Sequence, residues 1–184
     1  MDRKLILFSG SGGAWLEKVV CIDPGLGGTG WALFPKLGRG GNDCIAPADS
    51  GVLRPPKGER WQNQCHSLAA MVSGMLKATA AGAVVLEMPE VWACSSQGMA
   101  SATHAAKAGE PADLCKLLYL VGVMAAAAYG TGAGLPILVC PREWKGQLAK
   151  DQVARRIMAA FPGASFRDHE WDAVGMGLAA QGRL

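Results

Sequence analysis

The sequence predicts a mixed α/β fold in which helices flank a five-stranded sheet, the first three strands antiparallel and the others parallel. Three observations lead to this prediction. Three short apolar runs with turn residues between them open the chain, and the later apolar runs alternate with segments of helical periodicity. Strands joined by tight turns pair antiparallel, whereas strands joined through a helix pair parallel.

The first strand is predicted from the β-branched run 18–22, which ends in the turn sequence Asp23-Pro24-Gly25. A returning strand at 29–34 would place Trp31 and Leu33 on one face. The remaining elements follow from run length and period. The full set of predicted strands is 18–22, 29–34, 51–53, 83–86 and 135–140. The predicted helices are 59–80, 113–129, 150–161 and 170–180.

Composition indicates one globular domain spanning residues 1–184, with 1–17 as an N-terminal extension that could be flexible. Hydrophobic residues make up 50% of the chain and charged residues 18%, which excludes an intrinsically disordered protein. The six cysteines are scattered without a Cys-x-x-Cys pair, which argues against a zinc knuckle and favours a cytoplasmic protein with free thiols. The uncharged stretch 117–141 is broken by glycines and Pro136, so we expect a buried helix, a turn and a strand there, and no membrane segment.

The glycine-rich stretch after the first predicted strand admits two interpretations. Gly25-Leu26-Gly27-Gly28-Thr29-Gly30 matches the G-x-G-x-x-G pattern of dinucleotide-binding proteins. That pattern requires a helix to follow, whereas Trp31 to Pro35 is strand-like. A hairpin turn is therefore the favoured interpretation.

Acidic residues lie at the ends of two predicted strands. Asp23 follows one apolar run and Glu87 follows another. If the two strands are neighbours, the carboxylates converge, and a divalent cation is their natural partner. Alternatively, each is simply the first polar residue of a loop. His169 and Asp172 are three residues apart at a predicted helix start, where they share a face, although an acidic capping cluster would look the same.

Together these residues carry a resemblance to a known family. The motifs are Cys21-Ile22-Asp23-Pro24-Gly25 with Thr29-Gly30-Trp31, then Val84-Val85-Leu86-Glu87, then His169-x-x-Asp172-Ala173. In this order they resemble the RuvC-like Holliday junction resolvases of the RNase H-like superfamily, over most of the chain. The segment 141–146, with Lys150 beyond it, resembles the basic stretch of phage and prophage members.

The resemblance implies a site, a cofactor and a reaction. Asp23, Glu87, His169 and Asp172 would be the catalytic, metal-binding residues. Two Mg²⁺ ions, for which Mn²⁺ could substitute, would support phosphodiester hydrolysis that leaves 5′-phosphate and 3′-hydroxyl ends. The implied activity is symmetric cleavage of a four-way DNA junction by a homodimer. Lys145 would lie beside the acidic residues as a further catalytic residue.

A local excess of positive charge also favours a DNA partner. Residues 142–167 hold six basic and two acidic residues, although a solvated helix face would explain them as well. Trp92 follows the strand that carries Glu87 and is a candidate for stacking on an unpaired base, or for packing. The residues expected to contact DNA are Trp92, Arg142, Lys145, Lys150, Arg155 and Arg156.

Three alternatives remain open at this point. A nuclease of the same superfamily could act on flaps, forks or RNA–DNA hybrids with the same acidic site. A nucleotide-binding domain of the actin-like type has a similar glycine-rich hairpin after an Asp, but usually needs two such domains. A non-catalytic nucleic-acid-binding relative would have no reason to keep four ligands.

Overall fold

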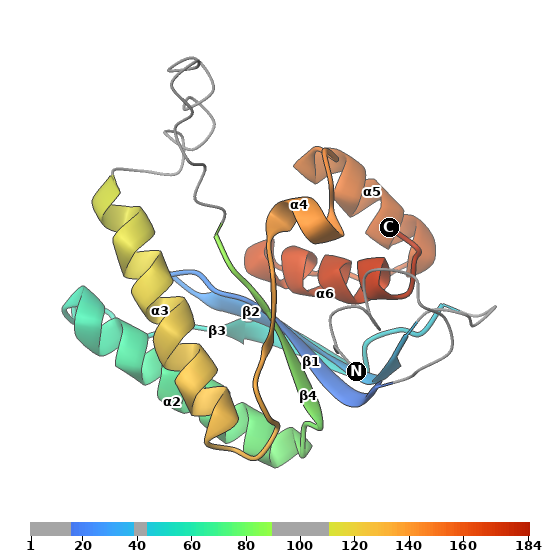
Figure 1. The fold of residues 1–184 in the computed structure, drawn as a ribbon. Helices are drawn as coiled ribbons and strands as arrows, with labels where there is room; N and C mark the ends of the chain where they lie inside the picture. Colours follow the sequence, from blue (N-terminus) through green and yellow to red (C-terminus); the bar gives the residue numbers. More distant parts are fainter. Residues whose placement is uncertain (1–15, 39–43, 90–110) are drawn as a thin grey trace, which may run out of the picture.

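A five-stranded mixed sheet forms the centre of the computed structural model, which describes residues 16–38, 44–89 and 111–184 (Figure 1). The strand order is β3-β2-β1-β4-β5. The strands are β1 (Leu16–Asp23), β2 (Thr29–Leu37), β3 (Asp49–Leu53), β4 (Ala83–Glu87) and β5 (Ile137–Val139). The helices are α2 (Trp61–Thr79), α3 (Pro111–Tyr129), α4 (Pro141–Trp144), α5 (Lys150–Ala160) and α6 (Asp168–Ala180). The predicted fold class is confirmed.

Strand pairing brings the carboxyl ends of β1 and β4 together. β1 pairs antiparallel with β2, and β2 with β3, as predicted for the first three strands. β1 and β4 are parallel neighbours, with Ile22 opposite Leu86, and β4 is parallel to β5. Because Asp23 and Glu87 each come one residue later, both lie at the same edge of the sheet.

Helices cover both faces of the sheet (Figure 1). On one face, α2 and α3 bury apolar side chains such as Leu68 and Met124 against Val20 and Leu86. On the other face, α5, α6 and Trp144 of α4 pack on the alternate strand residues, Cys21 and Val85 among them. Burial on both faces explains why β1 and β4 are continuous apolar runs.

Two glycines in α6 allow this helix to lie close to the sheet and to α4. A Cβ added at Gly177 would overlap the ring of Phe34 on β2, and one at Gly175 would lie 2.8 Å from the Trp144 ring. This close approach allows the first turn of α6 to reach the strand ends.

Several element boundaries differ from those predicted. β2 continues through Pro35 to Leu37, and Lys18, the residue opposite Pro35, has a left-handed backbone with φ 49°. The short helix α4 was not predicted, and α6 begins at Asp168 rather than at residue 170. No described helix is both long enough and apolar enough to span a bilayer, and no disulfide joins the described cysteines.

Candidate active site

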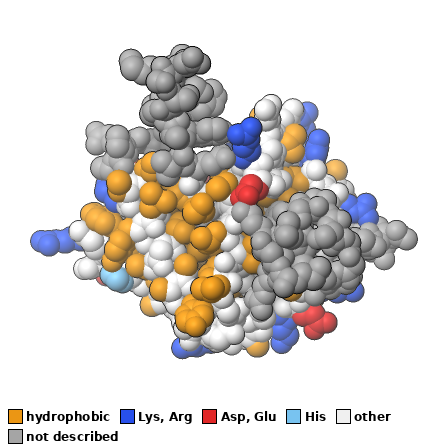
Figure 2. Space-filling model, viewed as in Figure 1, with side chains coloured by type: hydrophobic (Ala, Val, Ile, Leu, Met, Phe, Trp, Pro, Cys, Tyr) orange, Lys and Arg blue, Asp and Glu red, His pale blue; other side chains and the backbone are white. Residues whose placement is uncertain are grey.

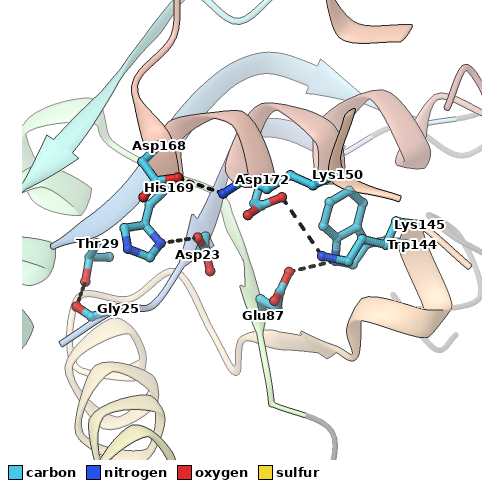
Figure 3. A network of polar contacts seen from close by, with 10 residues as sticks. All are labelled: Asp23, Gly25, Thr29, Glu87, Trp144, Lys145, Lys150, Asp168, His169 and Asp172. Atoms are coloured by element: carbon cyan, nitrogen blue, oxygen red, sulfur yellow. Dashed lines mark hydrogen bonds and ion pairs between the residues drawn. The ribbon is translucent and has the colours of Figure 1, made fainter. Parts of the chain in front are cut away.

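Four side chains that the sequence singles out meet at the carboxyl edge of the sheet. Asp23 ends β1 and Glu87 ends β4. His169 and Asp172 come from the first turns of α6, which the fold lays across this edge (Figure 3). His169 Nδ1 bonds to Asp23 Oδ2, so two of these residues are in direct contact although they lie almost 150 positions apart in the chain.

The glycines after β1 make room for the start of α6. A Cβ added at Gly25 would lie 2.7 Å from Cε1 of the His169 ring, and one at Gly30 would overlap the His169 carbonyl group. Gly28 N donates to Gly25 O at 3.1 Å, which closes a turn between two antiparallel strands. The hairpin interpretation is thus confirmed, and the dinucleotide-binding interpretation is wrong because no helix follows.

Asp23 and His169 form a direct pair. His169 Nδ1 donates to Asp23 Oδ2 at 2.7 Å. The bond raises the pKa of His169 from its ordinary value, which favours the charged imidazolium. Asp23 is only 6% exposed, and this burial raises its pKa, opposed by the bond from His169.

Glu87 lies in a similar environment. Its Oε2 accepts a hydrogen bond of 2.7 Å from Nε1 of Trp144. Burial raises the pKa of Glu87 to about 8, with Asp23 adding to the rise and Lys145 opposing it. The carboxylates of Asp23, Glu87 and Asp172 therefore repel one another in this site.

Two lysines offset part of this negative charge. Lys145 follows α4, and its Nζ lies 4.0 Å from Asp172 Oδ1. Lys150 begins α5, and its Nζ pairs with Asp168 Oδ1 at 2.7 Å at an exposed margin of the site. Asp168 is therefore engaged in an ion pair with Lys150.

The donor set fits a hard divalent cation, because crowded carboxylates whose charges raise one another's pKa are stabilised by a cation among them. In the part of the chain that the structure describes, no three Asp, Glu, His or Cys side chains are gathered closely enough to form a ready-made metal site. Asp23 instead bonds to His169, and Glu87 to Trp144. The predicted ligands thus lie at one edge of the sheet, where Asp23 and Glu87 are hydrogen-bonded to other side chains of the protein.

The remaining candidates lie further out or outside the described residues. Arg142 is exposed on α4, and Arg155 and Arg156 are exposed on α5, where Arg155 pairs with Asp151 at 2.8 Å. Trp92 falls in 90–110 and so lies outside the described residues.

Two further residues have roles that the sequence did not reveal. Glu170 is structural, because it accepts from Ser50 Oγ at 2.6 Å and from the Arg167 amide at 2.9 Å. Trp144 was missed as a site residue. The only feature of the sequence that could have indicated a role for Trp144 is its position directly before Lys145, after a predicted strand.

Comparison with known proteins adds a structural finding. No protein-family model and no curated protein matches this sequence. Among solved structures, Thermus thermophilus RuvC superposes with a TM-score of 0.61 at 20% identity, covering 88% of this chain and 91% of that one. T. thermophilus RuvC in complex with a Holliday junction substrate gives 0.64 at 18% identity, with 89% and 91% covered. The chain has the RuvC fold.

A more distant structure shares this architecture. The yeast mitochondrial Holliday junction resolvase Ydc2 superposes with a TM-score of 0.51 at 11% identity, covering 90% of this chain and 76% of that one. The RuvC fold confirms the RNase H-like five-stranded sheet that the motifs implied. The resemblance to phage and prophage members stays a prediction.

The raised pKa values on this RuvC fold predict an unusual pH dependence of stability without bound cations. Unfolded Glu87 releases its proton near its ordinary pKa of 4.5, but folded Glu87 keeps it up to about 8. Between these values the folded state binds more protons, so stability falls as pH rises. The raised pKa values of Asp23 and His169 act in the same direction. Between pH 5 and pH 8 we expect Glu87 alone to lower the stability by up to about 4 kcal/mol, since each pH unit between its unfolded and folded pKa values corresponds to about 1.4 kcal/mol.

Urea unfolding in the presence of a chelator measures this dependence. Glu87→Gln is neutral at every pH, and we expect it to flatten the profile markedly. Identical pH profiles for the two proteins would contradict the assignment of a buried, protonated Glu87.

Proposed function

We propose that this protein is a metal-dependent endonuclease that resolves four-way DNA junctions by symmetric phosphodiester hydrolysis. The single observation that carries the proposal is the convergence of Asp23, Glu87 and Asp172, with His169 and Lys145, at one edge of the sheet. A cluster of mutually repelling carboxylates beside a lysine suits a cation and a phosphate group. The RuvC fold supports the choice of a branched DNA substrate.

The metal would be Mg²⁺ as a pair of ions, or Mn²⁺, held by Asp23, Glu87, His169 and Asp172. When bound, the ions would supply a hydroxide nucleophile and a stabilised leaving oxygen. Hard oxygen donors suit Mg²⁺, and the imidazole makes Mn²⁺ an effective substitute.

The chain's own side chains bind and orient the substrate. Lys145 Nζ lies between Asp172 and the ring of Trp144, 4.0 Å from the carboxylate oxygen and 4.8 Å from the ring centroid. Held there, its charge can contact a phosphate oxygen as the strand approaches the carboxylates. Lys150 is two-thirds exposed and would exchange its partner Asp168 for a DNA phosphate at the margin of the site.

The wider DNA surface would extend from the site along α4 and α5. Arg142, Arg155 and Arg156 are exposed on these two helices, on the same side of the sheet as Lys145 and Lys150. Trp92 is proposed to stack on an unpaired base near the crossover, as an aromatic side chain in the segment after Glu87. We also propose that the protein acts in the cytoplasm.

A homodimer is proposed because symmetric cleavage needs two sites related by a two-fold axis. Hydrophobic side chains gather over α2 and α3 on the face shown in Figure 2. Met71 on α2 and the neighbours Leu118 and Tyr119 on α3 are 39%, 37% and 40% exposed. An exposed apolar face of this kind is typical of a protein interface.

We expect Leu118→Glu to convert the dimer to a monomer, because a buried unpaired charge at an interface costs several kcal/mol. Sedimentation velocity at micromolar concentration measures the change. Met158→Glu is the matched control, since Met158 is 55% exposed on α5, on the other face of the sheet. Dimers in both variants would place the interface elsewhere.

Cleavage of labelled DNA tests the proposed function. The substrates are a four-way junction, a fork, a flap, a linear duplex and an RNA–DNA hybrid, each with Mg²⁺, Mn²⁺ or chelator. We expect paired, symmetric nicks in the junction that chelator abolishes. Cleavage of the fork, flap or hybrid instead of the junction would support the proposed metal-dependent hydrolysis but contradict the proposed substrate. Junction binding without metal-dependent cleavage of any substrate would overturn the enzyme assignment in favour of a non-catalytic relative.

A further inference from the structure

The indole of Trp144 connects three parts of the candidate active site. Trp144 is the last residue of α4 and is 5% exposed. Its Nε1 donates to Glu87 Oε2 at 2.7 Å, and Lys145 Nζ lies 4.8 Å from its ring centroid (Figure 3). Its six-membered ring packs against α6 at Gly175, one turn after Asp172. One side chain therefore contacts β4, α6 and the lysine of the site.

The short helix that carries Trp144 is well anchored. Pro141 begins α4, and the Glu143 carboxylate accepts from the Cys140 amide at 2.7 Å, which caps the first turn. Lys145 N donates to Pro141 O at 2.9 Å and closes the helix. The backbone that carries Trp144 is thus fixed, its ring packs against α6, and its N–H points at Glu87.

A glutamate at a strand end has several rotatable bonds, so its carboxylate needs a partner to hold one orientation. An indole N–H can only donate, and a carboxylate oxygen is its natural acceptor. The bond engages one oxygen of Glu87, Oε2. Hydrogen-bond partners of metal-binding carboxylates act in this way, and their removal typically lowers metal affinity or activity about 10- to 100-fold.

We propose that Trp144 is a positioning residue, whose N–H holds the Glu87 carboxylate in the orientation from which it binds the catalytic cation. This inference rests on the proposed function, because it assumes that Glu87 is a metal ligand. It extends that proposal to a residue that is not itself a ligand.

Mn²⁺ binding to the full chain, measured by electron paramagnetic resonance, tests the inference without a cleavage reaction. The proteins are wild type, Trp144→Phe, Glu87→Gln and the double variant. We expect Trp144→Phe to weaken Mn²⁺ binding about tenfold. In the Glu87→Gln background the same change is expected to have little further effect, because the carboxylate that the N–H orients is already absent.

Two controls separate the hydrogen bond from packing. Ile157→Val removes one methylene group from the packing around Gly175 and Trp144 and leaves the N–H in place, so Mn²⁺ affinity is expected to stay within twofold of wild type. Site-specific replacement of Trp144 by 3-benzothienylalanine keeps the shape and removes only the donor. The 3-benzothienylalanine variant replaces Trp144→Phe in the experiment if thermal unfolding shows that Trp144→Phe does not fold.

Each outcome supports or overturns the proposal. Equal Mn²⁺ affinity in wild type and the donor-free variants would overturn the positioning role and leave the proposed function intact. Additive losses in the double variant would also overturn it, because they would show that Trp144 acts independently of Glu87. A wild-type protein that binds no Mn²⁺ would overturn the proposed metal site and this inference with it.

Discussion

Asp23→Asn is expected to abolish DNA cleavage, lowering the rate by about three orders of magnitude or more, while the protein stays folded. Asp23 is the most buried of the proposed ligands, at the end of the central strand β1. Loss of its charge would remove cation stabilisation worth several kcal/mol, and each 1.36 kcal/mol is about a tenfold change in rate. The Asn side-chain oxygen can still accept from His169 Nδ1, so the pair and its packing are retained.

Stability should rise or stay unchanged in the same variant, because burial raises the pKa of Asp23 and so penalises its charge. Junction cleavage with Mg²⁺ and urea unfolding with chelator are the two measurements. Asp49→Asn on β3 is the matched control, because Asp49 is exposed and its carboxylate accepts a hydrogen bond from the adjacent Ser50 amide at 2.9 Å. We expect the control to cleave at the wild-type rate. Retained cleavage by Asp23→Asn would disprove the assigned site.

Gly30→Ala is expected to cost about 3 kcal/mol of stability and at least about a hundredfold in cleavage. An added methyl group would overlap the backbone carbonyl of His169, and backbone cannot rotate away as a side chain can. The first turn of α6 would have to withdraw from the sheet. Because that turn also leads to Asp172, two site residues would move together, and displacement by about 1 Å can cost a hundredfold in rate.

Gly27→Ala is the control for Gly30→Ala, because a Cβ at Gly27 meets no atom within 4 Å. It makes the same chemical change three residues earlier, in the turn that precedes β2. Urea unfolding and junction cleavage compare the two variants. Similar behaviour of both would mean that α6 tolerates a shifted start, and that the close approach at Gly30 has no role in forming the site.

Most of the fold was predictable because its strands and helices have clear periods. The apolar runs of β1 and β4 and the turn after Asp23 indicated both the antiparallel hairpin and the parallel pair. The extension of β2 was not predictable, since Pro35 normally ends a strand and is tolerated here opposite the distorted backbone of Lys18. A helix as short as α4 has too few residues to show a period.

The candidate site was predictable as a list of residues but not as a set of contacts. Asp23 and Glu87 were visible as acids after apolar runs, and His169 and Asp172 as a pair on one helical face. The bond from Trp144 to Glu87 depends on how α4 packs against α6, which no local pattern encodes. The pairing of Lys150 with Asp168 likewise depends on how the consecutive helices α5 and α6 pack against each other.

The proposed ligands come from three distant segments of the chain, and this has a consequence during synthesis. A nascent chain that ends before α6 carries Asp23 and Glu87 but neither His169 nor Asp172. It also exposes the face of the sheet that α6 covers, including Phe34. If the proposed function is correct, a ribosome-bound or truncated product of this kind would be unable to cut DNA. Nuclease activity would then begin only after α6 has been synthesised and has packed on the sheet.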